Sequence, residues 1–315
     1  MKALMIADPI EKLKPAGDTS LFISQSLLNK KIETYFATAE DLVWEHSEVF
    51  VHAKKVLSSE KGRAPLLGSS EKFGILDFKL LFIRKDPPFD SSYVKLCWLL
   101  KPFENEIRIV NRPSVLLDHH EKMLPLEAVA ENFLKAEDII PTCIASSIAR
   151  ALDFVNALST DKVVLKPYFG FGGSDIFLLN RKNFEAEAKE HFDKNSDWIV
   201  QPFEDSVKTK GDCRVFFICG KYAGAFARLP KSGGYVSNLA KGGTAVLREL
   251  TEKESDLIDR CEKWVQRLEI DFVGADFIAE KLNEMNITSP TGFVNFESLT
   301  GKNLGDRLIE GLLHL

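Results

Sequence analysis

Two segments of the sequence carry side chains that could bind a polyphosphate and a divalent metal ion. In the first, VVLKPYFGFGGSDIF (163–177), Lys166 ends an apolar run and is followed by Gly170, Gly172 and Gly173. Backbone N–H groups of glycines can close around phosphate oxygens, and a lysine at a strand end adds a positive charge. The segment lacks the G-K-[ST] of a Walker A loop, and the strand expected after it excludes a dinucleotide fingerprint. A plain glycine-rich hairpin with a surface lysine is the alternative interpretation.

The second segment, DFIAEKLNEMN (276–286), offers the oxygen ligands that Mg²⁺ prefers, in Asp276, Glu284 and Asn286. Glu284 and Asn286 lie two apart on an expected strand and therefore share a face. A turn at 279–281 places Asp276 opposite Glu284, so that the three oxygens converge on one face. The other face is then filled by Ala275, Phe277, Met285 and Ile287. The spacing predicts a magnesium site of the kind that accompanies phosphates, with a solvated hairpin face as the alternative.

Cations and a glycine-rich loop complete the set of residues that could do chemistry. The cations are Arg84, Lys122, Arg214 and Arg228, each of which could equally be a surface residue. KSGGYVSNLAKGG (231–243) contains four glycines and few apolar residues, so we expect a mobile loop. Between two ordered hairpins, such a loop could be a lid over an active site or a plain surface loop.

The first third of the chain is expected to position part of this chemistry on a parallel sheet. Apolar runs predict strands at 2–7, 32–37, 49–56, 78–84 and 107–111, and the spacing at 19–30 predicts a helix. This alternation favours a doubly wound parallel sheet, whose ligands bind at the carboxyl ends of the strands. The segment 58–70 is expected to be a flexible loop.

The remainder divides into two further units. The middle unit is expected to contain helices at 121–134, 146–158 and 183–192, and strands at 163–167, 175–179 and 198–203. The last unit is richer in hairpins, with paired strands at 213–230 and 272–288, and helices at 251–268 and from about 304. At ~150 residues per domain the 315 residues predict two or three domains. We place them at 1–117, 118–203 and 204–315.

Composition excludes several classes of protein. A formal net charge of −5 argues against a dedicated nucleic-acid binder. No apolar run approaches the ~18 residues of a membrane span, and MKALMIADPI is not a signal peptide, so we expect a cytoplasmic protein without membrane contact. The five cysteines form no C-x-x-C pair and are expected to be free thiols.

The order of these motifs resembles that of the bacterial glutathione synthetases, which have the ATP-grasp ligase fold. The resemblance extends over nearly the whole chain, in IRKDPPFD (83–90), VNRP (110–113), EKM around Lys122 (121–123), LKP with FGGSDIF (165–177), GDCRVFFICG (211–220), ARLP with GGYVSNLAKGG (227–243), VGADFI (273–278) and EMNITSPTG (284–292). It implies an α/β architecture: an ATP-grasp fold preceded by a Rossmann-like N-terminal domain, with ATP bound between the central and C-terminal domains.

The resemblance also implies roles for individual residues. The residues implied for ATP are Lys122 and Lys166 with Gly172 and Gly173 at the phosphates, and Gln201, Phe203 and Glu204 at the adenine. Asp276, Glu284 and Asn286 would bind two Mg²⁺ or Mn²⁺ ions. The residues implied for the peptide substrate and its acyl phosphate are Arg84, Arg214, Arg228 and Asn238. Ser289 and Thr291 would lie near the second substrate.

The implied reaction joins γ-glutamylcysteine to glycine in two steps. ATP first converts the cysteinyl carboxylate into an acyl phosphate, and the glycine amine then displaces phosphate to give glutathione, ADP and phosphate. Two metal ions and a ring of arginines and lysines reduce the repulsion between the carboxylate and the triphosphate. Closure of the loop at 231–243 would protect the acyl phosphate from water. The resemblance further implies a homo-oligomer, a tetramer or a dimer.

Three positions depart from the family pattern. Val236 replaces an arginine that family members often carry in the lid loop, and Val294 and Asn295 replace an arginine and a glutamate. These departures leave open a related carboxylate–amine ligase with another acceptor. A non-catalytic ATP-binding protein is a third alternative, against which the intact Asp276, Glu284, Asn286 and Lys166 argue.

Overall fold

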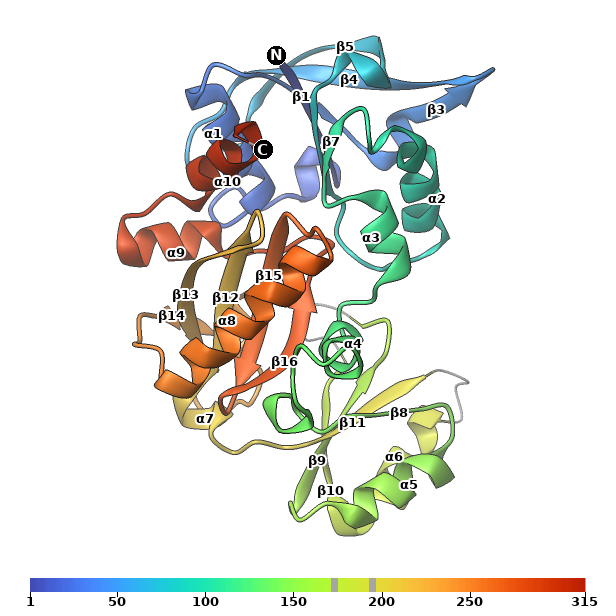
Figure 1. The fold of residues 1–315 in the computed structure, drawn as a ribbon, viewed down its shortest axis with the longest axis vertical. Helices are drawn as coiled ribbons and strands as arrows, with labels where there is room; N and C mark the ends of the chain where they lie inside the picture. The colour runs from blue at the N-terminus through green and yellow to red at the C-terminus, as the bar shows by residue number, and fades with distance from the viewer. Residues whose placement is uncertain (171–174, 193–196, 315) are drawn as a thin grey trace.

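The structure, a computed structural model, describes residues 1–170, 175–192 and 197–314. Within these residues the strands form three sheets, which we name the N-terminal, central and C-terminal sheets. Figure 1 shows that the C-terminal sheet lies between the other two along the long axis of the molecule. None of the described helices is long and apolar enough to cross a membrane.

The N-terminal sheet is mixed rather than wholly parallel. Its strands are β1 (Lys2–Ala7), β2 (Glu33–Ala37), β3 (Leu42–Glu45), β4 (Glu48–Ser58), β5 (Leu66–Gly74), β6 (Leu80–Arg84) and β7 (Arg108–Val110). β1, β2, β6 and β7 run parallel, whereas β3, β4 and β5 pair antiparallel. The prediction of an all-parallel sheet is therefore wrong at one edge. The predicted loop at 58–70 is also partly wrong, because its end belongs to β5, which pairs with β4.

Helices cover both faces of the N-terminal sheet, which explains why residues 3–7 of β1 are all buried. One face packs against α1 (Thr19–Asn29) and the C-terminal α10 (Leu304–Leu313). The other face packs against α2 (Ser91–Leu100) and α3 (Pro113–Asp118), which the sequence analysis did not predict. Asp18 and Asp90 cap α1 and α2, because their side chains accept hydrogen bonds from first-turn N–H groups.

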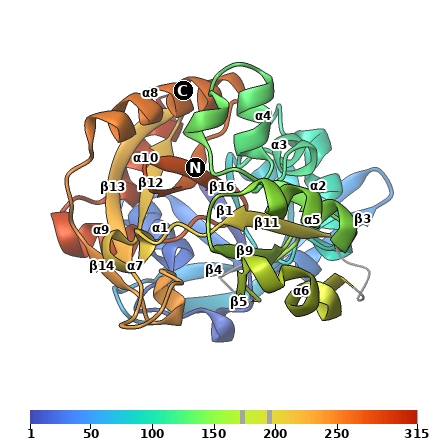
Figure 2. The ribbon, with the colours of Figure 1, turned by 90° about the horizontal axis from the view of Figure 1, so that it is seen from below.

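The central sheet is antiparallel, and one of its surfaces faces the C-terminal sheet. Its order is β10 (Phe177–Asn180), β9 (Lys162–Pro167), β11 (Trp198–Pro202) and β8 (Cys143–Ala145). α5 (Ile148–Ala157) and α6 (Phe184–Phe192) cover the opposite surface, on the side away from β12 and β13 in Figure 2. Alternation along β9 buries Val163 and Leu165 under these helices and turns Val164 and Lys166 the other way.

The C-terminal sheet has the order β14 (Thr244–Val246), β13 (Lys221–Leu229), β12 (Asp212–Ile218), β15 (Phe272–Ile278) and β16 (Lys281–Asn286). α8 (Glu252–Arg267) covers one face and begins at a capping box formed by Thr251 and Glu254. α7 (Val207–Lys210) and α9 (Phe293–Thr300) flank the sheet. Both predicted hairpins, 213–230 and 272–288, are confirmed.

The predicted helix at 121–134 is shorter than expected. α4 (Leu124–Ala130) begins beside Pro125, and its C-cap is Glu131. Asn132 follows with a positive φ of 62°, which a helix does not tolerate. α4 packs against β16, so this part of the middle segment lies on the C-terminal sheet.

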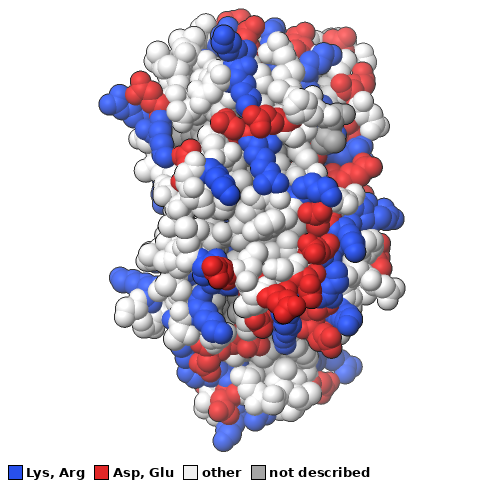
Figure 3. Space-filling view, turned by 60° about the vertical axis from the view of Figure 1, so that its left-hand side comes forward, with Lys and Arg blue, Asp and Glu red and all other residues white. Residues whose placement is uncertain are grey.

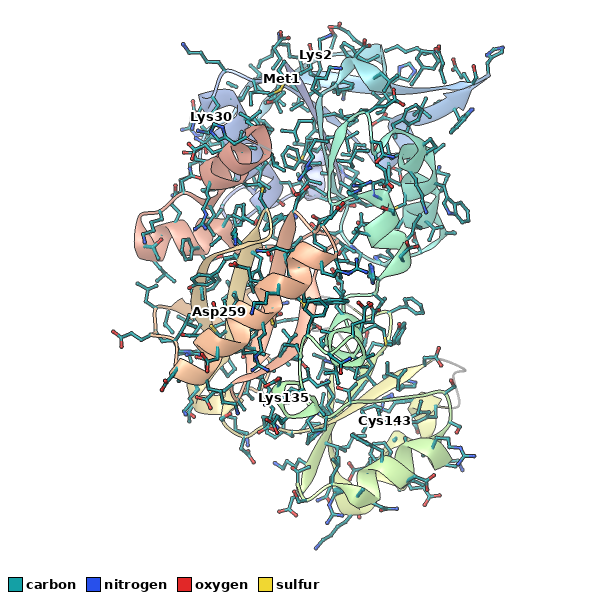
Figure 4. All side chains as sticks on the ribbon, viewed as in Figure 1. Met1, Lys2, Lys30, Lys135, Cys143 and Asp259 are labelled. Carbon is teal, nitrogen blue, oxygen red and sulfur yellow. The ribbon has the colours of Figure 1, made fainter. Side chains whose placement is uncertain are left out.

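The chain returns to its beginning at the C-terminus. α10 packs along α1, where Lys30 and Glu310 form an ion pair of 2.6 Å. Lys30 is labelled beside this helix pair in Figure 4. On the face shown in Figure 3, acidic and basic side chains are interspersed rather than separated.

Candidate active site

A cavity of about 440 Å³ lies between the central and C-terminal sheets. It is lined by most of the site residues that the sequence indicates: Lys122, Lys166, Gln201, Phe203, Glu204, Arg214, Arg228, Asn238, Asp276, Glu284, Asn286, Ser289 and Thr291. Gly172 and Gly173 lie outside the described residues. Arg84 is described and does not line this cavity.

The two lysines enter the cavity from different elements. Lys166 projects from β9, and burial lowers the pKa of its ammonium group. Its Nζ lies 3.4 Å from Oδ1 of Asn283. Lys122 follows α3, and its Nζ donates hydrogen bonds to the carbonyl oxygens of Pro167 (3.1 Å), Tyr168 (2.7 Å) and Gly170. Burial lowers the pKa of Lys122 to about 8, although the nearby Glu284 opposes this shift.

The cavity lining includes an apolar part, which we name the apolar slot. It consists of Ile140, Val164, Ile176, Phe203 and Ile278. The segment 201–204 leaves β11 along this slot, and a flat aromatic base is the type of ligand that such a slot accepts. In the side chain of Gln201, Nε2 donates a hydrogen bond to Oγ1 of Thr142 at 2.8 Å.

One face of the C-terminal sheet carries several charged residues of the cavity. Arg214 on β12 lies opposite Asp276 on β15, and Asp276 lies opposite Glu284 on β16. The predicted pairing of Asp276 with Glu284 is confirmed, although the turn has two residues, Ala279 and Glu280, and a bulge makes up the difference. The opposite face is apolar as predicted, with Ala275, Phe277, Met285 and Ile287 buried in the core.

Asp276 is the centre of a buried ionic network. Arg214 donates to both of its oxygens, from Nε at 2.6 Å and from Nη2 at 3.0 Å. Nη2 of Arg228 lies 2.9 Å from Oδ1, and Asn286 donates to Oδ2 at 3.2 Å. Burial opposes ionisation of Asp276, but the two guanidinium groups outweigh it and lower its pKa to about 2. The carboxylate is therefore ionised throughout the physiological range.

The donor set at this face fits a divalent metal ion. Asp276, Glu284 and Asn286 supply hard oxygens, and Mg²⁺ takes one or two protein carboxylates together with phosphate oxygens. The Glu284 side chain lines the cavity and makes no hydrogen bond or ion pair with any residue of 1–170, 175–192 or 197–314. Within these ranges, no group of three or more His, Cys, Asp or Glu residues could hold a metal ion. Binding of a metal ion at this face therefore relies on Asn286 and on phosphate oxygens as further ligands.

The loop at 231–243 lies across the cavity. Tyr235, Val236, Ser237 and Asn238 all line it. The hydroxyl group of Tyr235 donates to the carbonyl oxygen of Ile176 at 3.1 Å, and its ring meets that of Phe203 edge-on at 6.2 Å. These contacts join the loop to the central sheet.

The loop 288–291 forms the remaining wall. Ser289 and Thr291 line the cavity, and the carbonyl oxygen of Thr291 accepts a hydrogen bond of 2.9 Å from Arg214. Arg84 lies behind this loop, where Nη2 donates to the carbonyl oxygen of Pro290 at 2.9 Å and Nε donates to Ser20. Arg84 therefore supports this wall by binding the backbone of the 288–291 loop.

Several lining residues were missed by the sequence analysis, among them the polar residues Asp212, Glu121 and Asn283. Asp212 binds Arg228 through two hydrogen bonds of 2.7 and 2.9 Å. Asp212 lies opposite Arg228 only because a bulge shifts the β12–β13 register. The sequence gives the hairpin turn but does not place that bulge. The sequence did contain a signal for Glu121, because this residue directly precedes the candidate phosphate-binding residue Lys122.

Comparison with known proteins places the chain in a family. The family model of the prokaryotic glutathione synthetase N-terminal domain matches residues 1–116, and that of the ATP-grasp domain matches residues 129–301. A glutathione synthetase of Prochlorococcus marinus subsp. pastoris is 32% identical, with 100% of both chains covered. One of Gloeobacter violaceus is 31% identical over 99% of this chain and 97% of its own.

Solved structures show the same fold at low identity. The D-cycloserine synthetase DcsG superposes with a TM-score of 0.69 at 15% identity, covering 98% of each chain. The ATP-grasp ligase PsnB, complexed with a minimal precursor, gives 0.66 at 14% identity over 100% of this chain and 98% of its own. The cavity between two sheets is thus set in an ATP-grasp fold, and the chain belongs to the prokaryotic glutathione synthetase family.

Proposed function

We propose that this protein joins γ-glutamylcysteine to glycine at the expense of ATP, through an acyl phosphate, releasing ADP and phosphate. The observation that carries the proposal is the composition of the two cavity walls. Lys122 and Lys166 enter near the glycine-rich segment, and Arg214, Arg228 and Asp276 face them from the C-terminal sheet. The positive charges of these lysines and arginines favour the binding of a polyanion and of a second anionic substrate.

In the first step, an oxygen of the cysteinyl carboxylate attacks the γ-phosphorus of ATP, and ADP leaves. Both reactants are negatively charged, so their approach requires fixed positive charge. Lys122 and Lys166 are proposed to hold the phosphates, and Arg214 and Arg228 to hold the peptide carboxylate and the transferred phosphoryl group. The acidic partners Asp276 and Asp212 keep the two guanidinium groups in place before substrates arrive.

In the second step, the amine nitrogen of glycine attacks the acyl carbon, and phosphate leaves as the nitrogen loses a proton. Ser289 and Thr291 are proposed to line the amine subsite, and Asn238 to face the acyl phosphate. The loop at 231–243 is proposed to exclude water from the acyl phosphate while the amine binds. The contacts of Tyr235 with Ile176 and Phe203 support closure onto the central sheet.

Asp276, Glu284 and Asn286 are proposed to hold the divalent ions, Mg²⁺ or Mn²⁺. These ions supply neutralisation of phosphate charge when bound. The adenine is proposed to bind in the apolar slot against the backbone of Gln201, Phe203 and Glu204, with Gly172 and Gly173 at the phosphates.

One observation favours a second candidate, a ligase of the same mechanism with another acceptor amine. Val236 lines the cavity at the lid position where family members often carry an arginine. Val294 and Asn295 lie on α9 and do not line the cavity. Of the three positions that differ from the family pattern, only Val236 therefore lies where it could affect the choice of acceptor amine.

Release of ADP in a coupled assay tests the proposal. We expect ADP release only with γ-glutamylcysteine, and formation of glutathione, identified by mass spectrometry, only when glycine is also present. Coupling of a different amine in preference to glycine, across a panel of small amino acids and amines, would select the second candidate. Absence of ADP release with every amine would contradict both.

Location and assembly belong to the same proposal. All five cysteines, which lie within the described residues, are free thiols, which suits a reducing cytoplasm. A homo-oligomer is proposed from the resemblance alone, and sedimentation velocity at micromolar concentration tests it.

A further inference from the structure

Glu121 is a cavity-lining carboxylate that has no role in either proposed reaction step. It lies in the connection between α3 and α4, directly before Lys122. Its Oε1 accepts three hydrogen bonds, from the backbone N–H groups of Ile287 (2.8 Å) and Thr288 (2.9 Å) and from Oγ1 of Thr288 (2.7 Å). Three donors on one carboxylate oxygen make a strongly directed contact.

The backbone of Glu121 extends the same contact. Its carbonyl oxygen accepts a hydrogen bond of 3.1 Å from the N–H group of Met285. Glu121 therefore binds the two residues that flank Asn286, which are Met285 and Ile287, and Met285 directly follows Glu284. β16 is the edge strand of the C-terminal sheet, so its outer N–H groups would otherwise have no strand partner.

Lys122, the next residue, contacts the opposite wall of the cavity. Its Nζ binds the carbonyl oxygens of Pro167, Tyr168 and Gly170, at the start of the glycine-rich segment. The dipeptide 121–122 thus connects the strand that carries Glu284 and Asn286 to the loop that follows Lys166.

We propose that Glu121 is a positioning residue for the metal-binding face. It fixes the outer edge of β16. In this way it sets how far Glu284 and Asn286 lie from the proposed phosphate-binding lysines. The inference rests on the proposed function, because it assumes that Glu284 and Asn286 hold a divalent ion beside a nucleotide. Groups that orient metal ligands typically contribute 10–100-fold to metal affinity.

The test separates the reach of the side chain from its charge. Glu121→Gln keeps an oxygen acceptor at the same distance and removes the charge, whereas Glu121→Asp keeps the charge and shortens the side chain. Binding of Mn²⁺ is measured by electron paramagnetic resonance in the presence of a non-hydrolysable ATP analogue. We expect affinity within about 3-fold of wild type for Glu121→Gln and a loss of about 10–100-fold for Glu121→Asp.

The matched control is Glu127→Asp on α4, which shortens a glutamate that binds His119 at 2.6 Å, outside the metal-binding face. We expect its Mn²⁺ affinity to be unchanged. Binding of the nucleotide analogue without metal is expected to stay within about 2-fold for all variants, since Glu121 contacts β16 rather than the apolar slot. Circular dichroism checks the fold, and amide exchange at Ile287 and Thr288 is expected to accelerate only in Glu121→Asp.

The possible failures are distinguishable. A wild-type chain that binds no Mn²⁺ beside the nucleotide would overturn the proposed function and this inference together. A wild-type chain that binds Mn²⁺, with Glu121→Asp binding it equally well, would overturn the positioning role alone. A lowered melting temperature with unchanged Mn²⁺ affinity would make Glu121 a purely structural residue. A loss in Glu121→Gln with wild-type affinity in Glu121→Asp would show that charge, not reach, is responsible, and would also overturn the positioning role.

Discussion

At the scale of single residues, the chemistry depends on which charged groups already have partners. Asp276 already has Arg214, Arg228 and Asn286 as partners, whereas the Glu284 side chain has no hydrogen bond or ion pair within the described part of the chain. An uncommitted carboxylate beside two lysines is the group most available to a divalent ion.

Glu284→Gln is expected to lower turnover by at least 100-fold, because an amide oxygen without charge is a weak Mg²⁺ ligand. The fold should be preserved, since the substitution is isosteric and breaks no hydrogen bond of the side chain. ADP release and circular dichroism measure the two effects. Glu280→Gln, in the turn of the same hairpin and outside the cavity, is the matched control and should retain wild-type turnover. A fully active Glu284→Gln variant would contradict the metal assignment.

Two adjacent histidines, His119 and His120, are expected to contribute to the free energy of unfolding with opposite dependences on pH. The hydrogen bond to Glu127 raises the pKa of His119, so its stabilising effect is present below the unfolded-state pKa and is lost as pH rises through the folded-state value. Burial lowers the pKa of His120 to about 4, so stability is lost as pH falls from about 6.5 towards 4. By pH 5 that loss is about 2 kcal/mol.

Urea unfolding of His119→Gln and His120→Gln at pH 5.5 and pH 8 tests this pair. His119→Gln should destabilise the protein more at pH 5.5, and His120→Gln more at pH 8. The His120 variant also loses stacking on Tyr168, whose ring centroid lies 4.2 Å away, and this loss is the same at both pH values. Parallel pH dependences in the two variants would contradict the assignment.

At the scale of elements, Tyr235 joins the lid loop to the central sheet through its hydroxyl group and its ring. Tyr235→Phe removes the hydrogen bond to Ile176 and keeps the ring against Phe203. A single neutral hydrogen bond contributes about 1 kcal/mol, so we expect the KM for ATP to rise about 3- to 10-fold with little change in stability. Steady-state kinetics measures this effect. Tyr222→Phe on β13, outside the cavity, is the control, and an equal effect in both variants would exclude a specific lid contact.

At the scale of the whole molecule, the last helix binds the chain's two ends together. A Cβ atom on Gly305 would lie 2.5 Å from Oγ of Ser26 and 3.0 Å from the Phe22 ring, so α10 can approach α1 only with glycine there. Gly305→Ala is expected to destabilise the protein by about 1–3 kcal/mol through overpacking. This exceeds the gain in helix propensity of at most ~1 kcal/mol.

Urea unfolding measures that loss. Gly17→Ala, where a Cβ atom would meet nothing within 4 Å, is the matched control and should be neutral or slightly stabilising. Independent unfolding of the N-terminal part with no shift of midpoint in Gly305→Ala would contradict a joint structural role for α1 and α10.

Several features followed from the sequence because they depend on neighbours along the chain. The hairpin at 272–288 is defined by its alternation, so the pairing of Asp276 with Glu284 and the apolar opposite face were predicted correctly. The motifs also gave the family, since their order requires no knowledge of packing. Local pattern was misleading where an edge strand has exposed side chains, as in β5, which looks like a loop.

Only the tertiary structure decided which of these groups meet. The register shift that brings Asp212 to Arg228 comes from a bulge. The contact of Glu121 with Ile287 and Thr288 joins residues 166 and 167 positions apart, and the placement of α10 on α1 spans still more. No sequence period encodes such contacts, because they depend on how separately folded sheets pack. The sequence therefore determined the chemical groups and their strands, and packing determined which of them are held, which are available and what joins the two walls of the cavity.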